Sequence, residues 1–363
     1  MNHFITRATT LSALALAAPL AFSDGHTPDF WGSLKVGAEY RMMEEEDIAK
    51  GGFPNHFEVQ DAYSYVGISG EQKVTETMTG FYTYSVYLNV ADGEFGKSRQ
   101  TAWYGKGVRR EHNVSKVGVK DSWGSVSTGR MWNAYYNRIT WTTDRFNSAW
   151  TGFDTYSAFQ TDRTLSYHSP SFSGLDFGLN LVQPGADDPN GDTRIIFGTT
   201  YATDVFSVSF AYDDQGEDGD DSNDLVAVAA ETTMGALRVG FKYETAGKGN
   251  AYATKSNGEA EDAVLMGVIV EYTMNNHAFR VHYATGDYPG YLPVNTDDDD
   301  ATKAGEGSEI SLGYSQAVTD HLLYFAEYHT SDDYCAYEVS TGTAAAGVDT
   351  GCSVVSTGIH LGF

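Results

Sequence analysis

Serine and histidine side chains are the first candidates for chemistry, because a hydrolase needs a serine activated by a nearby histidine base. The chain has ten histidines, and they are scattered along it without a common spacing. The sequence contains no G-x-S-x-G, H-E-x-x-H or C-x-x-C motif. A lone histidine in a strand is more often a surface residue than a base, so the pattern predicts that the chain is not an enzyme.

Dense acidic clusters are the next candidates, since carboxylate oxygens are the ligands that calcium and magnesium prefer. The densest clusters are residues 44–47, 213–224 and 297–300. They are either solvated loops or sites that loosely bind calcium or magnesium. Such bound cations could bridge the loops to anionic lipid headgroups. Residues 188–192 begin like a calcium-binding loop, but Thr193 stands where that motif needs glycine. We therefore expect no tightly bound cofactor.

Cys335 and Cys352 are the only two cysteines, and both fall in the last long polar segment. In an oxidising compartment they are expected to form a disulfide. Two free thiols or a pair of metal ligands are the alternatives.

The amino-terminal residues have the composition of a secretory signal peptide. Arg7 precedes a mostly apolar stretch, and Ala21 and Ser23 are small residues at the positions that determine cleavage. We expect residues 1–23 to be removed, leaving 24–363. An anchor helix is the alternative, but the apolar run is short and Pro19 interrupts it. The formal charge of −26 excludes nucleic acid as a partner.

Apolar and polar residues alternate along runs of about ten residues, which is typical of strands with one apolar face. Leu34 and Val36, for example, share one face of a run, while Lys35 and Arg41 share the other. Two runs, 225–232 and 262–272, are apolar on both faces, which a soluble β-sandwich explains equally well. We count sixteen runs, beginning near residues 30, 61, 79, 112, 124, 162, 175, 193, 205, 224, 236, 261, 277, 308, 321 and 353.

The connections between runs alternate in length, as in an up-and-down barrel with two unlike ends. Segments such as 202–204 and 275–276 are short, whereas 43–60, 91–111 and 132–161 are long. Lipid cannot hydrogen-bond an exposed backbone, so a spanning sheet must close on itself. Aromatic residues recur near the ends of runs, and the last run stops at Phe363. The sequence predicts an all-β fold, a sixteen-stranded antiparallel transmembrane β-barrel.

The chain resembles the general, non-specific porins of Gram-negative outer membranes, which are trimers of sixteen-stranded barrels. The resemblance runs from the first strand to the last residue, and its clearest segments are 31–37, 66–71, 124–130, 167–175 and terminal Phe363. It implies a homotrimer in the bacterial outer membrane, in contact with lipid and lipopolysaccharide. It also implies that Phe363 is the signal read by the barrel-assembly machinery.

In that family the third long loop folds into the barrel and narrows the pore, and the resemblance assigns this role to residues 132–161. The family's loop carboxylates face basic residues on the opposite wall. The resemblance therefore implies Asp144 and Asp154 on the acidic side and Lys35 as the main basic residue. Further candidates for the basic side are Arg41, Arg238, Lys242 and Arg280.

The family's second loop contacts a neighbouring subunit, where it meets an arginine. The resemblance implies that Arg130 is this arginine and that Asp92 or Glu94 is its partner. Alternation places Arg130 on the outer face, so the other interpretation is an arginine that reaches the lipid headgroups.

The sequence departs from the family in its basic wall. The second run, 61–71, has no arginine, and the fourth offers only Lys116 and Lys120. Because acids outnumber bases by 49 to 23, we expect a channel for passive diffusion of small hydrophilic solutes and ions that prefers cations. The alternative is a substrate-specific porin of the same fold, which would need an aromatic slide or a dense basic ladder.

Overall fold

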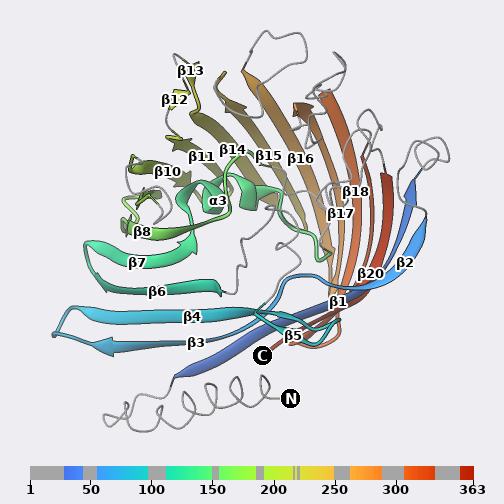
Figure 1. Ribbon diagram of the computed structural model, residues 1–363, viewed down its shortest axis with the longest axis horizontal. Coiled ribbons are helices and arrows are strands. Elements are labelled where there is room, and N and C mark those ends of the chain that lie inside the picture. Colours follow the sequence, from blue (N-terminus) through green and yellow to red (C-terminus); the bar gives the residue numbers. More distant parts are fainter. Residues whose placement is uncertain are drawn as a thin grey trace.

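The protein forms a sheet that closes on itself, in a computed structural model that describes residues 28–43, 55–96, 112–148, 155–184, 192–215, 217–218, 221–248, 262–287, 306–331 and 352–363. The first strand, β1 (Asp29–Met43), pairs antiparallel with the last, β20 (Cys352–Gly362). Figure 1 shows the strands curving around the short helix α3 (Ala134–Arg138). The β1–β20 pairing removes the free sheet edge that lipid could not satisfy.

Sixteen strands make up the barrel wall, as predicted. The sheet has 18 named strands, but β2 (His56–Asp61) and β3 (Ser64–Lys73) pair with successive parts of β1 and form one wall strand. β5 (Glu94–Phe95) pairs only with the end of β4. The other wall strands are β4 (Thr79–Asn89), β6 (His112–Asp121), β7 (Gly124–Trp132), β8 (Gln160–His168), β9 (Leu175–Val182), β10 (Arg194–Ala202), β11 (Phe206–Asp213), β14 (Leu225–Met234), β15 (Leu237–Ala246), β16 (Ala263–Met274), β17 (His277–Asp287), β18 (Glu306–Ala317) and β19 (Leu322–Ser331).

The second wall strand begins earlier than the sequence predicts. Residues 56–60 were expected in a loop, but they pair with β1. The strand is interrupted at Tyr63, whose φ of 66° is left-handed, so its first half does not continue the alternation of its second half. The Asp61 carboxylate accepts hydrogen bonds from the backbone N–H groups of Ser64 at 2.9 Å and Val90 at 3.1 Å, which satisfies the broken ladder. Two further short strands, β12 (Glu217–Asp218) and β13 (Asp221–Ser222), pair with each other in a separate sheet outside the wall.

The structure explains why the two runs 225–232 and 262–272 are apolar on both faces. Their outward side chains, such as Val226 and Val268, are exposed, while Leu225 and Leu265 on the inner face are buried. The inner residues form one buried cluster with Tyr135 of α3 and its neighbours. The barrel therefore holds an apolar core between α3 and the strands from β10 to β16, in addition to its apolar outer surface.

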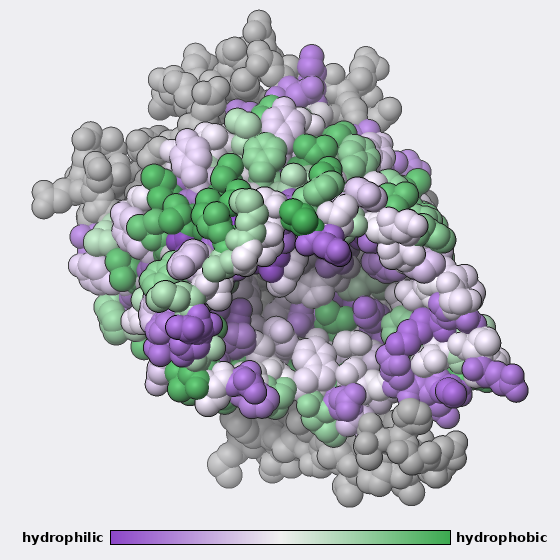
Figure 2. Space-filling view, turned by 180° about the vertical axis from the view of Figure 1, so that it is seen from behind, coloured by the Kyte–Doolittle hydropathy of each residue, from purple (hydrophilic) through white to green (hydrophobic). Residues whose placement is uncertain are grey.

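The outer face of the wall is apolar around the barrel. Exposed side chains recur at alternate positions, as in Phe210, Val228, Phe241, Phe279 and Leu312. Figure 2 shows apolar patches on the wall around a hollow with hydrophilic residues at its rim. A closed wall with an apolar exterior suits a lipid environment and does not fit a soluble β-sandwich. Among the described residues, no helix is long and apolar enough to cross a membrane.

The carboxyl-terminal residue completes the barrel seam. The backbone of Phe363 exchanges two hydrogen bonds with Gly32, at 2.9 and 3.2 Å. The Phe363 ring lies so close that a Cβ on residue 32 would come within 2.5 Å of it. Glycine at position 32 thus allows the terminal ring to lie over β1. The predicted signal peptide, residues 1–23, lies outside the described residues.

We expect Phe363→Ala to lower the yield of folded barrel, because the seam loses its terminal ring and the proposed assembly signal. The measurement is the fraction of protein in the outer membrane whose gel mobility changes on heating. Phe279→Ala, which removes an exposed ring near the start of β17, is the matched control. Equal losses in the two variants would contradict a special role for the last residue.

Candidate pore constriction

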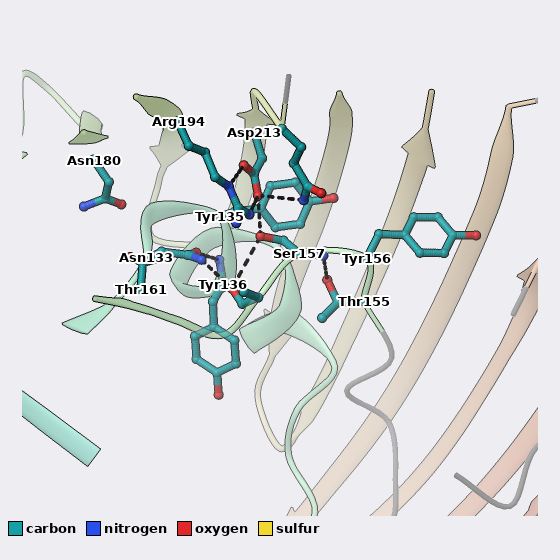
Figure 3. A network of polar contacts seen from close by, with 12 residues as sticks. Asn133, Tyr135, Tyr136, Thr155, Tyr156, Ser157, Thr161, Asn180, Arg194 and Asp213 are labelled. Atoms are coloured by element: carbon teal, nitrogen blue, oxygen red, sulfur yellow. Dashed lines mark hydrogen bonds and ion pairs between the residues drawn. The ribbon is translucent and has the colours of Figure 1, made fainter. Parts of the chain in front are cut away.

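Residues 133–148 and 155–159, here called the α3 segment, connect β7 to β8 and are fixed near both ends (Figure 3). Asn133 caps α3, since its side chain accepts a hydrogen bond from the Tyr136 backbone N–H at 2.8 Å, and it also donates to a carbonyl at the far end of the segment. Ser157 donates to Asp213 at 2.7 Å, and Asp213 pairs with Arg194. The end of the segment is therefore bound to β11, and Asp213 connects it to Arg194 of β10.

A buried carboxylate on β15 joins the two parts of the α3 segment. One oxygen of Glu244 accepts hydrogen bonds from the hydroxyls of Tyr135 and Thr155, both at 2.8 Å, and from the Tyr156 backbone N–H at 3.1 Å. The other oxygen accepts from Lys242 at 2.8 Å, and both side chains are 0% exposed. A buried ion pair is stable only when its remaining hydrogen-bonding groups are satisfied, as the Glu244 oxygens are here.

The far part of the segment reaches the opposite side of the wall. The backbone N–H groups of Asn147 and Ser148 each donate to Glu327 of β19 at 2.7 Å. Phe146 packs edge-on against His282 of β17, with ring centroids 6.4 Å apart. The α3 segment thus contacts inward-facing side chains on strands from β10 to β19.

Inward-facing charges of alternating sign lie on consecutive strands from β14 to β17. Arg238 pairs with Glu231, and Arg280 pairs with Glu271 at 2.5 Å. Arg145 of the α3 segment lies 3.7 Å from Glu231. These three arginines share two carboxylates, Glu231 and Glu271, so most of the positive charge on this part of the wall is cancelled.

Asp144 and Lys35, which the sequence analysis paired, influence each other in the structure. Asp144 is half-buried and accepts a hydrogen bond from the Tyr136 hydroxyl at 2.5 Å. Burial raises the pKa of the Asp144 carboxyl, and it outweighs the lowering by Tyr136 and by the positive charges of Lys35, Arg145 and Lys242. The carboxylate of the segment thus lies within electrostatic range of the predicted basic residue on β1.

Known proteins of one family resemble this chain along most of its length. A family profile described as Gram-negative porin matches residues 8–334. The chain belongs to the Gram-negative porin family. It is an outer-membrane porin, and its relatives are channel proteins rather than enzymes.

The relatives of this porin are distant in sequence and close in fold. A monosaccharide porin of Halomonas sp is 25% identical over 272 residues, covering 65% of this chain and 69% of the relative. Outer membrane protein YedS of Escherichia coli is 24% identical over 272 residues, covering 71% and 68%. The solved anion-selective porin from Comamonas acidovorans aligns with a TM-score of 0.68 at 14% identity, covering 93% of this chain and 100% of that one. Salmonella typhi OmpF in complex with daunomycin aligns at 0.65 with 18% identity, covering 94% and 99%.

Most of the basic residues predicted for the pore form ion pairs with carboxylates of the barrel. Lys242 is fully buried as the counter-ion of Glu244, so it has no surface to present to a water-filled lumen, contrary to the expectation from alternation. Arg41 is buried beside Glu58, with which it forms an ion pair. Arg238 and Arg280 are paired as described above. Alternation identifies their inward direction but not their partners on neighbouring strands.

Arg130 is also buried, although strict alternation places it on the outer face. A β-bulge between Gly129 and Met131 shifts the register of β7 against β8 at this point. The guanidinium donates to Asp162 at 2.5 Å and to Gln160 at 2.7 Å within the same chain. A contact of Arg130 with a neighbouring subunit stays a prediction.

The remaining predicted sites are only partly covered by the described residues. Asp92 accepts a hydrogen bond from Asn89 at 2.7 Å, and Glu94 lies in β5; their contact with another subunit stays a prediction. No group of three or more His, Cys, Asp or Glu side chains in the described part of the chain is arranged to hold a metal. Predictions that lie outside the described residues concern Asp154, Cys335, the side chain of Cys352, and the acidic clusters 44–47 and 297–300.

The sequence analysis did not predict that three carboxylates hold the α3 segment, namely Asp213, Glu244 and Glu327, and it placed Asp213 only in the acidic cluster 213–224. Each is an inward residue of an alternating strand, and alternation alone cannot separate a carboxylate in water from one that binds a loop. A usable signal lies in the neighbouring strand, where Leu265 stands opposite Glu244. An apolar inward residue opposite an acidic one indicates that another part of the chain packs on the inner side of the wall there.

We expect Glu244→Gln to loosen the α3 segment, because the Lys242 ammonium would remain buried without its counter-charge. Breaking such a pair costs about 3–5 kcal/mol, enough to raise the cleavage of the segment by thermolysin about tenfold or more. The double variant Lys242→Met/Glu244→Gln removes both charges and should recover most of the protection. Unchanged cleavage in the single variant would contradict this role of Glu244.

Proposed function

We propose that this porin passes small hydrophilic solutes and ions by passive diffusion, that the α3 segment narrows the pore, and that the pore prefers cations. The observation that carries the proposal is the path of the segment from β7 to Glu327 on β19. Because the α3 segment contacts inward-facing side chains on so many strands, it reduces the open cross-section of the barrel. A sixteen-stranded barrel is otherwise wide enough for an aqueous channel.

The cation preference is supported by the way charges are paired on the inner wall. Asp144 and Glu327 accept hydrogen bonds from uncharged donors, as do Asp61 and Asp287, so their negative charges are not cancelled by a bonded base. Most inward bases have a bonded carboxylate. These ion pairs are Arg41–Glu58, Arg138–Asp176, Arg194–Asp213, Arg238–Glu231, Lys242–Glu244 and Arg280–Glu271.

The surplus charge that remains is therefore mainly negative, in line with the formal charge of −26 for the whole chain. A negative lumen concentrates cations and repels anions. The solved Comamonas acidovorans porin is anion-selective by its title. At 14% identity that property does not carry over to this chain.

A homotrimer is part of the same proposal. A trimeric form is among the solved porins that share the fold, the in-vitro folded OmpT of Vibrio cholerae, with a TM-score of 0.61 at 15% identity. The subunit contact through Arg130 needs revision in one respect, since its guanidinium already binds Asp162. We therefore propose that a neighbouring loop with Asp92 or Glu94 would have to share or replace that partner.

A substrate-specific porin is the second candidate function. The 25% identical Halomonas relative is named as a monosaccharide porin, and such a function needs a saturable site in the lumen. Saturation of flux with rising solute concentration would favour this candidate over plain diffusion.

We expect the reversal potential of the refolded porin in a KCl gradient to have the sign of a cation-preferring pore. Asp144→Asn should reduce the cation-to-anion permeability ratio by up to about fivefold, since one unit charge a few ångströms from the path is worth ~1 kcal/mol in water. Glu76→Gln, in the exposed turn after β3, is the matched control and should leave the ratio unchanged. Anion preference of the unmodified porin would overturn the proposal.

Acidification should weaken the cation preference at a pH where ordinary surface carboxylates are still ionised. The reason is that burial raises the pKa of Asp144, so its negative charge is present above that raised pKa and is lost as the pH falls through it. Reversal potentials measured from neutral pH downward should show this step, and Asp144→Asn should lack it. Coinciding profiles of the two proteins would mean that Asp144 does not titrate in this range.

A further inference from the structure

Trp141 is an exposed apolar side chain in an unusual place. It lies in the short helix η2 (Thr140–Thr142) of the α3 segment, and 48% of it is exposed. Apart from Phe95 of β5, every other exposed large hydrophobic side chain of the described residues belongs to the outer face of a wall strand, a turn or a strand end. Those residues face lipid or the rim, whereas Trp141 lies on a segment bound to the inward-facing side of the wall. An indole exposed there has no lipid to cover it.

The backbone beside Trp141 is fixed, so the ring is held in one position. Thr140 and Thr142 are buried on either side of it. The Thr142 carbonyl accepts a hydrogen bond from Arg238 at 2.9 Å, and the Thr142 side chain leaves space only for glycine at position 240 of β15. With its neighbours packed onto the wall, the ring of Trp141 is directed away from it.

The indole is covered in part by two neighbours, and nearly half of it remains exposed. The Arg145 guanidinium lies over the ring, 4.7 Å from its centroid. Tyr136 lies 6.2 Å away, between centroids, and it connects Trp141 to Trp132 and Phe159 in a series of aromatic contacts. The cation–π contact fixes the ring and leaves the rest of its surface for another ligand.

Charged groups of both signs lie next to the residues that contact this ring, since Tyr136 donates a hydrogen bond to the Asp144 carboxylate. Asp144 follows three residues later in the same segment, and Arg145 lies 3.7 Å from Glu231, which also pairs with Arg238. A free cation would compete with Arg145 for the ring, and a free anion would meet Asp144 and Glu231. A neutral cyclic molecule with an apolar face and hydroxyls at its edge suits an indole beside charged groups best. Its apolar face can stack on the aromatic ring, while its hydroxyls form hydrogen bonds with the charged side chains.

We propose that Trp141, with Arg145 and Asp144 beside it, forms a weak binding site for a neutral cyclic monosaccharide on the path through the pore. The apolar C–H face of the sugar stacks on the indole, and its hydroxyls bond to the guanidinium and the carboxylate. This inference rests on the proposed function, since it requires an open channel in which the α3 segment borders the lumen.

The test is the ion current through the refolded porin in a planar bilayer while D-glucose is added. We expect the current to fall and to saturate, and we expect sorbitol, an acyclic polyol with similar hydroxyls and no ring face, to have a much weaker effect. Trp141→Ala should raise the half-blocking glucose concentration about five- to tenfold, and Trp141→Phe should raise it less. Trp123→Ala, which removes an exposed tryptophan stacked on Tyr167 at the β6–β7 turn, is the control and should match the unmodified porin.

The outcomes separate this inference from the proposed function. Absence of any ohmic current before sugar is added would contradict the channel itself. An ohmic current with no saturating block, an equal block by sorbitol, or an unchanged Trp141→Ala variant would overturn the sugar site and leave the channel intact. If Trp141→Ala does not fold, as judged by heat-shifted gel mobility, the glucose-to-sorbitol ratio of Trp141→Phe decides the question.

Discussion

Each backbone N–H and C=O group that faces lipid needs a hydrogen-bond partner within the protein, because the hydrocarbon offers none. The pairing of β1 with β20 meets this requirement by bringing together strands from the two ends of the chain. The interrupted second wall strand obeys it too, since the Asp61 carboxylate accepts the N–H groups of Ser64 and Val90 where the ladder breaks. The rest of the structure depends on this closure, since it fixes which side chains point inward.

Closure creates a second problem, because sixteen strands enclose more space than their own side chains fill. The α3 segment occupies part of that space, and it brings its own backbone N–H groups with it. Glu244 and Glu327 accept several of these groups, and Tyr135 and its neighbours form an apolar core against β10 to β16. One part of the interior is therefore packed like a soluble protein, which leaves the remainder for water and solutes.

The strands and the seam could be predicted from the sequence because both follow from local alternation. Positions of the sixteen runs agree with the wall strands to within a few residues, except where Tyr63 breaks the second one. The inward direction of Lys35 follows from the same rule. The burial of Lys242 and Arg130 does not follow from it. The Lys242–Glu244 ion pair is buried because of the neighbouring strand and the segment that covers it. Arg130 turns inward because a β-bulge changes the register of β7 without a marked change in sequence.

The pairing of inward charges has a consequence for transport. When an arginine and a glutamate on adjacent strands are bonded, their fields largely cancel beyond a few ångströms in water, so they shape the wall without setting its sign. Selectivity then depends on the few charged groups that lack a bonded counter-charge, such as Asp144. An uncharged surface such as the Trp141 ring lies outside this balance. The proposed sugar site at that ring also uses the Asp144 carboxylate, so solute binding and ion preference would be linked through this one residue.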